Sequence, residues 1–104
     1  MRENQAARGL AALGNRTRLR LFKLLVKAGE AGLNVGDIGA RIRVPASTLA
    51  HHLASLTRAG LVIQERRGRE VVSRADYDAM DGLVAYLTKE CCLGVTAARG
   101  SDAA

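Results

Sequence analysis

Leucine residues recur in the middle of the chain at the spacing of one helix face. Leu49, Leu53 and Leu56 lie four and three residues apart, which places their side chains on one side of an α-helix. Polar residues fall opposite them. The pattern predicts a helix over about 46–59 with a buried face and a face open to solvent, and Gly60 follows as a typical residue beyond a helix end.

Two further helices are predicted before this one. Residues 3–13 are rich in alanine and end before Gly14, which suits a helix with small side chains. Asn15 is a good N-cap for a helix over 16–27, and apolar residues cover so much of that helix that it belongs at the centre of the core. Arg18 breaks its apolar pattern, so this side chain needs a partner or an exit to solvent.

The remaining elements are a short helix, a hairpin and a last helix. Asn34 resembles the N-cap of a helix of about two turns, which ends before Pro45. Residues 61–65 and 69–73 read as two strands, joined by a turn at Arg66–Gly68. The last helix is predicted from Asp76 to about Cys92.

Composition limits the class of protein. A chain of 104 residues fits one domain, which we assign to residues 1–94, with a small, polar, frayed tail over 95–104. Phe22, Tyr77 and Tyr86 are the three aromatic residues, too few for a module that stacks single-stranded bases.

Several sequence signals are missing. No stretch is long and apolar enough to span a bilayer, and the first ten residues lack the core of a signal peptide. No nucleophile–base pair, phosphate-binding loop or catalytic metal spacing is recognisable. We therefore expect a cytoplasmic protein that is not an enzyme and has no membrane partner.

Charge is unevenly distributed along the chain. The net charge is +6, and residues 41–74 hold seven arginines against two glutamates. Residues 75–104 hold two basic against five acidic residues. A basic balance favours an anionic partner such as nucleic acid, and this distribution places its binding surface in the middle of the chain.

Two short helices followed by a basic hairpin predict a winged helix-turn-helix fold, mainly α with a small β-hairpin wing, in the order α-α-α-α-β-β-α. The stretches ALGNRTRLRLFKLL, VGDIGARIRVPASTLAHHLASLTRAGLV and ERRGREVV resemble the ArsR/SmtB family of bacterial metal-sensing repressors. The resemblance implies a homodimer joined through the first and last helices. It also implies binding to double-stranded operator DNA and release when a metal or another inducer binds.

Candidate DNA contacts follow from the residue types. Small polar side chains at Ser47, Thr48 and His51 can enter a major groove, and a basic hairpin tip can reach the phosphate backbone. The resemblance extends the recognition helix to Ala46, Ala50 and His52. For His52, the alternatives are packing, a phosphate contact and metal binding. For His51, the alternative is a solvated surface residue. The arginines added to the candidate set are Arg43, Arg58, Arg66, Arg67 and Arg69, and ordinary solvated charge is the alternative for the hairpin.

Two metal sites that the resemblance implies are not matched. Asn34 and Gly36 stand where one family site has a Cys-x-Cys pair, and the last helix carries acidic residues but no histidine for a zinc site. Cys91 and Cys92 remain, in the motif LTKECC, as ligands for a thiophilic species. Some family members carry a third cysteine nearby, which this chain lacks, so a third donor would come from a small thiol or the partner chain.

The sequence thus predicts a transcriptional repressor that is released by a thiophilic inducer at Cys91–Cys92. The inducer would be a trivalent arsenical, antimonite or another soft metal, and two thiolates suit a species that needs only two. No cofactor is required. The alternatives are a cysteine that simply packs on the stripe of Met80, Val84 and Leu87, a thiol redox-responsive repressor of the same fold, and a winged helix module that binds proteins.

Overall fold

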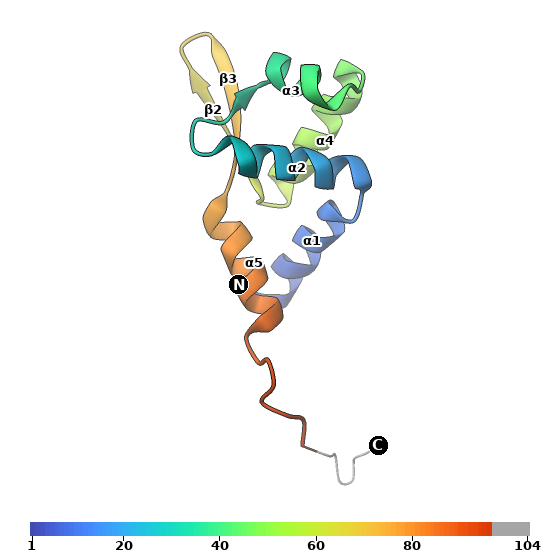
Figure 1. The fold of residues 1–104 in the computed structure, drawn as a ribbon, viewed down its shortest axis with the longest axis vertical. Coiled ribbons are helices and arrows are strands. Elements are labelled where there is room, and N and C mark those ends of the chain that lie inside the picture. The colour runs from blue at the N-terminus through green and yellow to red at the C-terminus, as the bar shows by residue number, and fades with distance from the viewer. Residues whose placement is uncertain (97–104) are drawn as a thin grey trace.

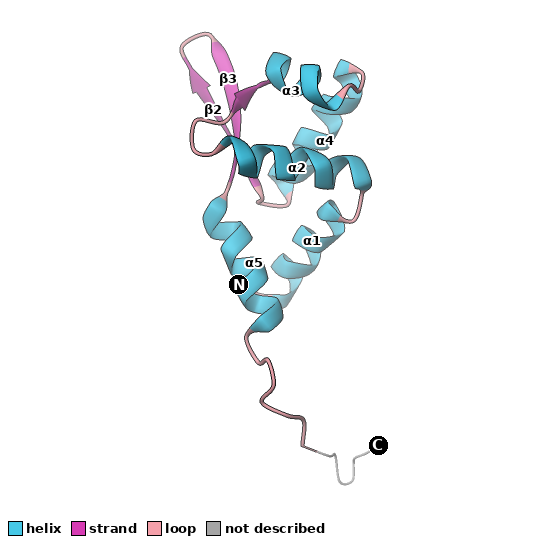
Figure 2. Ribbon diagram, viewed as in Figure 1, coloured by secondary structure: helices cyan, strands magenta, loops and turns pink. Residues whose placement is uncertain are grey.

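The structure is a computed structural model, and it describes residues 1–96. Within that range the chain forms five helices and three strands (Figure 2). Their bounds are α1 Glu3–Leu13, α2 Arg16–Ala28, β1 Leu33–Asn34, α3 Val35–Ile42, α4 Ala46–Arg58, β2 Val62–Arg67, β3 Glu70–Ala75 and α5 Tyr77–Thr88. The predicted winged helix-turn-helix order is confirmed, with one strand added between α2 and α3.

The elements separate into an upper and a lower part (Figure 1). In the upper part, α3 and α4 form the helix-turn-helix pair above α2, and β2 and β3 form the wing. In the lower part, α1 and α5 lie together, and the N-terminus lies beside α5. A Cβ atom on Gly9 of α1 would lie 3.6 Å from a methyl group of Leu83 on α5, so these two helices are in close contact.

Local capping fixes the starts of the helices. The Asn15 side chain accepts a hydrogen bond from the Arg18 amide at 3.0 Å, and the Asn34 side chain accepts one from the Asp37 amide at 2.8 Å. Both bonds satisfy first-turn donors that a helix cannot satisfy itself. The two N-caps predicted from the sequence are thereby confirmed.

The sheet is antiparallel, with strand order β1–β3–β2. In the wing, Val62 pairs with Ala75 and Arg67 pairs with Glu70. The turn at Arg66–Gly68 was therefore misplaced, because Arg66 and Arg67 belong to β2 and the turn consists of Gly68 and Arg69. The strand β1 was not predicted; Leu33 pairs with Ser73 and thereby attaches the start of the helix-turn-helix pair to the wing.

The core lies between α2, α4 and the sheet. Leu21 and Leu25 of α2, Ile38 of α3, and Leu49 and Leu56 of α4 are at most 1% exposed. The leucine stripe of α4 and the central position of α2 are as predicted. Burial of these side chains from three consecutive helices holds α4 in a fixed position, so that its opposite face is presented to solvent.

The end of the last helix differs from the prediction. α5 ends at Thr88 rather than near Cys92, and Cys92 has a positive φ of 66°. Cys91 therefore does not continue the helical stripe that includes Leu87, and within a single chain its thiol is exposed rather than packed. The predicted frayed tail lies mostly at 97–104, outside the described residues. No helix in residues 1–96 is long and apolar enough to cross a membrane.

Candidate nucleic-acid interface and thiol pair

The exposed face of α4 carries small and polar side chains. Ala46, Ser47, Ala50 and His51 are exposed, and Thr48 is half-buried. Pro45 occupies the N-cap position and provides no side-chain acceptor to the first turn. A helix with short side chains on its outer face can approach the edges of bases closely, so these five residues form one continuous candidate surface.

His52 does not belong to that surface. Its side chain is buried, with 9% exposure, and its Nδ1 lies 3.3 Å from Nη1 of Arg18 on α2. A ring in this position packs against α2 and is not presented with the exposed face of α4, so the structure favours the packing alternative for His52 over the DNA contact. His52 is thus a partner for Arg18, which the sequence predicted to need one within its apolar helix.

The three arginines at the tip of the wing are not equivalent. Arg66 and Arg69 are exposed, and within residues 1–96 neither guanidinium has a hydrogen bond or an ion pair. Arg67 donates from Nη1 to the carbonyl of Ala31 at 2.8 Å and from Nη2 to the Glu65 carboxylate at 2.7 Å. The sequence prediction treated the three alike, whereas the structure uses Arg67 to attach the wing to the loop after α2 and leaves Arg66 and Arg69 free.

A network of charges supports the wing. The Glu65 carboxylate accepts hydrogen bonds from Arg67 and, at 3.1 Å, from Nε of Arg74, and Arg74 also reaches Glu30 at 3.3 Å. These two hydrogen bonds hold the pKa of Glu65 below its usual value. The same contact with Glu65 raises the pKa of Arg74, so the network is fully charged near neutral pH and orients β2 and β3 as a unit.

The other two candidate arginines flank the helix-turn-helix pair. Arg43 is the C-cap of α3, is exposed and has a left-handed backbone with φ 59°. Arg58 is exposed in the last turn of α4 and donates to the Ser55 hydroxyl at 3.3 Å. Arg43 therefore lies in the turn before the exposed face of α4, and Arg58 lies at the opposite end of that helix.

Asn34, which stands where the family's Cys-x-Cys site has a cysteine, has a structural role instead. Asn34 caps α3, and its Nδ2 donates to the carboxylate of Glu70 on β3. The Asn34 side chain thus joins α3 to the wing with its own two polar atoms. On α5, Asp76 is likewise used as an N-cap, since it accepts from the Ala79 amide at 3.1 Å. No cluster of three or more metal-ligating side chains is found in the described part of the chain.

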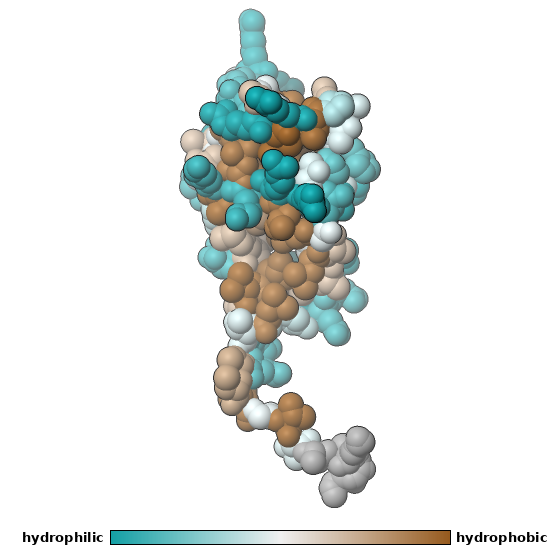
Figure 3. Space-filling view, turned by 45° about the vertical axis from the view of Figure 1, so that its right-hand side comes forward, coloured by the Kyte–Doolittle hydropathy of each residue, from teal (hydrophilic) through white to brown (hydrophobic). Residues whose placement is uncertain are grey.

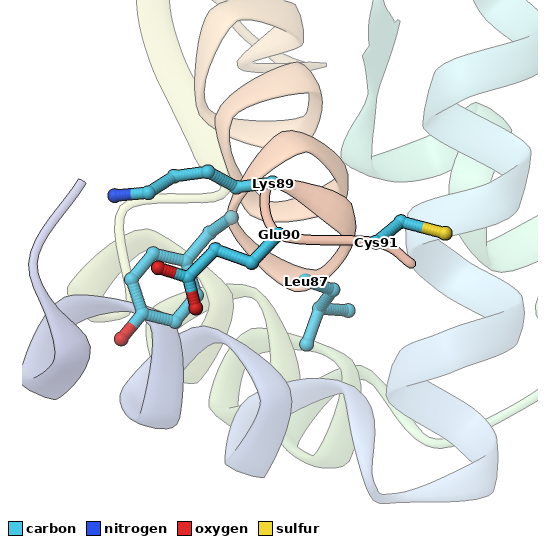
Figure 4. A pocket seen from close by; sticks show the side chains of 5 residues that line it. Leu87, Lys89, Glu90 and Cys91 are labelled. Atoms are coloured by element: carbon cyan, nitrogen blue, oxygen red, sulfur yellow. The ribbon is translucent and has the colours of Figure 1, made fainter. Parts of the chain in front are cut away.

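Cys91 and Cys92 lie in the turns after α5, and both are exposed. Their Sγ atoms are 2.9 Å apart, and this contact, with a smaller contribution from desolvation, raises the pKa of Cys91. Figure 4 shows Cys91 at one edge of a pocket of about 350 Å³, with its sulfur directed away from the side chains of Lys89 and Glu90. The turn therefore brings two thiols together, and the adjacent Glu90 carboxylate extends away from Cys91.

Apolar side chains are exposed on the lower part of the molecule. Leu10 of α1 is 42% exposed, and Val84 and Leu87 of α5 are 58% and 60% exposed. Figure 3 shows a continuous hydrophobic surface in this lower half, where α1 and α5 lie. The sequence signal was the apolar stripe on the last helix, which is uncovered in a single chain.

Comparisons with known proteins agree with this architecture. A protein family model described as "Helix-turn-helix domain" matches residues 13–65, about half of the chain. A curated relative from Halobacterium salinarum, named "Putative arsenical resistance operon repressor ArsR", is 38% identical over 60 residues, which cover 58% of this chain. That alignment covers 46% of the relative, so it spans about half of that protein's length.

Two solved structures extend the likeness to most of the chain. An ArsR-like transcriptional regulator from Rhodococcus sp. RHA1 has a TM-score of 0.74 and 28% identity, and the match covers 83% of this chain and 78% of that one. A winged helix-turn-helix DNA-binding domain from Mycobacterium bovis, described as homodimeric and as a possible ArsR-family regulator, has a TM-score of 0.66 and 27% identity over 86% of this chain and 82% of that one. With the helix-turn-helix match and the wing, these findings show that the chain belongs to the ArsR/SmtB family of winged helix-turn-helix transcriptional regulators.

Proposed function

We propose that this protein is a homodimeric repressor that binds operator DNA and is released by a thiophilic inducer at Cys91–Cys92. The observation that carries the proposal is the surface formed by the exposed face of α4 and the two free arginines of the wing. Its support comes from the shape of that surface, from the exposed thiol pair, and from relatives described as transcriptional regulators.

The α4 face is suited to reading bases in the major groove. Ser47 and His51 provide hydrogen-bonding groups, and Ala46 and Ala50 beside them are too small to hold the helix away from the base edges. Arg66 and Arg69 then neutralise phosphates next to the groove. Because the phosphate contacts release counterions, they contribute affinity without base specificity.

The partner proposed for the apolar surface on α1 and α5 is a second copy of this chain. Leu10, Val84 and Leu87 are exposed on these two helices, and Figure 3 shows a hydrophobic surface in this part of the molecule. A related domain of similar length is described as homodimeric. A two-fold dimer would place its two recognition helices at successive major grooves, about 34 Å apart, and would require a palindromic operator.

The inducer site is proposed at the two cysteines. Soft metals and metalloids select thiolates, and the two sulfurs are exposed and adjacent. Since the neighbouring Glu90 carboxylate extends away from Cys91, the pair alone suits a species that takes two thiolates, such as a monosubstituted trivalent arsenical or mercuric ion. Inorganic arsenite or antimonite would take its third donor from a small thiol or the partner chain.

DNA binding is tested with the protein and a random duplex library, from which the tightest binder is selected. The His51→Ala variant should lose about 1–3 kcal/mol of preference for the selected duplex over a random one. The Arg66→Ala/Arg69→Ala variant should weaken binding to both duplexes. It should also make the slope of log K against log salt less steep, by about 0.9 for each phosphate that is no longer neutralised. Lys89→Ala removes one charge from the end of α5 and is the control.

Two results would contradict the DNA-binding proposal. Absence of selected binders would favour a module that binds proteins instead. Equal losses for His51→Ala on selected and random duplexes would show that His51 on α4 does not read bases. An unchanged salt slope in the double arginine variant would show that the wing arginines do not contact phosphates.

The inducer is tested on the DNA-bound protein by titration with phenylarsine oxide, arsenite, antimonite and mercuric ion, followed by anisotropy. Release is expected with the wild type and not with Cys91→Ser/Cys92→Ser, which has no cysteine left. Release by hydrogen peroxide alone, with formation of a disulfide, would identify the redox alternative. A response that persists in the double variant would contradict both the inducer-binding and the redox mechanism.

A further inference from the structure

The Arg18 side chain connects three helices. Arg18 lies in the first turn of α2, its Nε donates to the carbonyl of Ala12 in α1 at 2.7 Å, and its Nη1 lies 3.3 Å from Nδ1 of His52 in α4. One guanidinium therefore joins α1, which contributes to the proposed dimer surface, to α4, the proposed recognition helix.

The contact with Ala12 follows from the end of α1. Ala12 lies in the last turn of that helix, where the carbonyl groups have no further helical amide to bond. A cation at this end is also favoured by the helix dipole. With Nε held by Ala12, the planar guanidinium is fixed in orientation, and its Nη1 can hold the ring of His52 in turn.

The contact with His52 defines the state of the imidazole. Arginine can only donate, so Nδ1 must accept, and the neutral ring carries its proton on Nε2. Burial, the charge of Arg18 and the neighbouring His51 all lower the pKa of His52. Two more cations, Arg8 of α1 and Arg58 of α4, line the pocket between these helices. The charged groups on this side therefore also disfavour a protonated, positively charged His52.

We propose that the Arg18–His52 contact is an acid-sensitive connection that positions the recognition helix against α1, and that a proton bound at Nδ1 of His52 breaks it and weakens specific DNA binding. The inference rests on the proposed DNA-binding function. A proton on Nδ1 occupies the lone pair that accepts from Arg18 and places two cations in contact. His51 is the adjacent residue on the exposed face, so displacement of His52 moves the base-reading surface more than the wing arginines.

The central variant is His52→Asn. The Oδ1 atom of asparagine is as many bonds from the backbone as Nδ1 of histidine, so it can accept from Arg18, but it does not titrate. Affinities for a selected and a random duplex are measured between pH 8 and pH 5.5, with circular dichroism to establish that the protein is folded at each pH. In the wild type we expect the ratio of selected to random affinity to fall about threefold by pH 5.5, toward the tenfold limit that a one-unit lower pKa in the bound state would reach only at a pH below both pKa values. In His52→Asn the ratio should change less than about twofold, within the additivity of independent effects.

A second pair of variants tests the arginine. In Arg18→Lys one ammonium must replace two nitrogens that are directed at different helices, so binding to the selected duplex should weaken at pH 8. Arg20→Lys makes the same exchange at an exposed position of α2 and should have no effect. An equal effect of the two exchanges would overturn the role of Arg18.

The failure of this inference is distinguishable from the failure of DNA binding. No preference for any duplex at pH 8 would reject the proposed function. A preference at pH 8 whose acid loss is the same in wild type and His52→Asn would reject the inference alone. If the variants do not fold, the pKa of His52 is measured by NMR in the wild type with and without the selected duplex, and equal values would overturn the proposal.

Discussion

Gly32 provides a sharp test of how the helix-turn-helix pair is attached to the wing. It lies in the loop between α2 and β1, with φ +65°, where the chain passes directly over β3. A Cβ atom there would lie 2.5 Å from the carbonyl oxygen of Ser73 and 2.7 Å from Cγ1 of Val72. The perturbation is Gly32→Ala, which adds this single atom.

The expected loss has two parts. A left-handed backbone costs a residue with a Cβ about 1–2 kcal/mol. The overlap with Ser73 must also be relieved, and β3 cannot retreat because it is paired on both sides, with β1 and with β2. The loop must therefore move and give up the short β1 pairing, at about 0.5–1.5 kcal/mol for each hydrogen bond. With two such bonds, these terms predict a loss of about 2–5 kcal/mol, a large part of a typical stability of about 5–15 kcal/mol.

Gly68 is the matched control. Its φ is +64°, one degree from that of Gly32, but a Cβ atom there would have no heavy atom within 4 Å. Gly68→Ala should therefore lose only the backbone term, about 1–2 kcal/mol. The difference between the two variants isolates the contact with β3.

The assay is urea unfolding followed by far-UV circular dichroism. All three proteins are compared at one protomer concentration, because dimerisation would couple stability to concentration. Gly32→Ala should have a much lower midpoint than Gly68→Ala, with similar slopes. If the two variants agree within about 0.5 kcal/mol, then the close approach of the loop to β3 does not constrain the fold.

Two further predictions concern the attachment of α5 and the charge network of the wing. Tyr77→Phe removes a hydroxyl that donates to the carbonyl of Val26 at 2.8 Å and should lower the melting temperature by about 4–8 °C for a loss near 1 kcal/mol, whereas Tyr86→Phe, whose hydroxyl has no hydrogen bond in the described residues, should not. If Tyr77→Phe and Tyr86→Phe have equal melting temperatures, the hydrogen bond from Tyr77 to Val26 does not stabilise the attachment of α5. Because its two arginine partners hold the pKa of Glu65 below its usual value, the carboxylate contributes stability that is complete above about pH 4.3 and is lost as the pH falls through the lowered value. Glu65→Gln should therefore reduce the difference in stability between pH 7 and pH 3, and an unchanged difference in acid melts would contradict the network.

The helices were predictable because their signals are local. An asparagine three residues before an orphan amide forms a cap within one turn, and Asn15 and Asn34 both do so. The leucine stripe of α4 needs no knowledge of its partners to indicate a buried face. The short strand β1 gave no such signal, because two residues that pair with a strand about 40 residues away carry no period of their own. The end of α5 was missed because an apolar stripe indicates a helix face but not the residue at which the helix ends.

The site was predictable as a region and not residue by residue. The arginines of the wing are equivalent in sequence, and only the fold brings the carbonyl of Ala31 to Arg67. The two histidines are adjacent, yet one turns outward and the other is buried, because successive residues of a helix lie about a third of a turn apart. Arg18 could be recognised as anomalous within an apolar helix, but its partner His52 is 34 residues away and follows from the packing of α2 against α4.

The helix α2 connects the two parts of the molecule at both of its ends. Near its start, Arg18 bonds α1 and contacts α4; near its end, the carbonyl of Val26 accepts from Tyr77, the first residue of α5. Both helices of the proposed dimer surface are thus attached to α2, and α2 is packed against the recognition helix. Cys91 and Cys92, by contrast, lie beyond the last turn of α5, whose 12 residues span about 18 Å at the rise of a helix, and they follow the exposed Leu87. A ligand on the thiols would therefore lie at the end of α5, close to the proposed dimer surface. Under the proposed function, its effect on DNA would act through the relation between the two protomers, or through α5 and its anchor on α2, and not through direct contact with the proposed DNA-binding face.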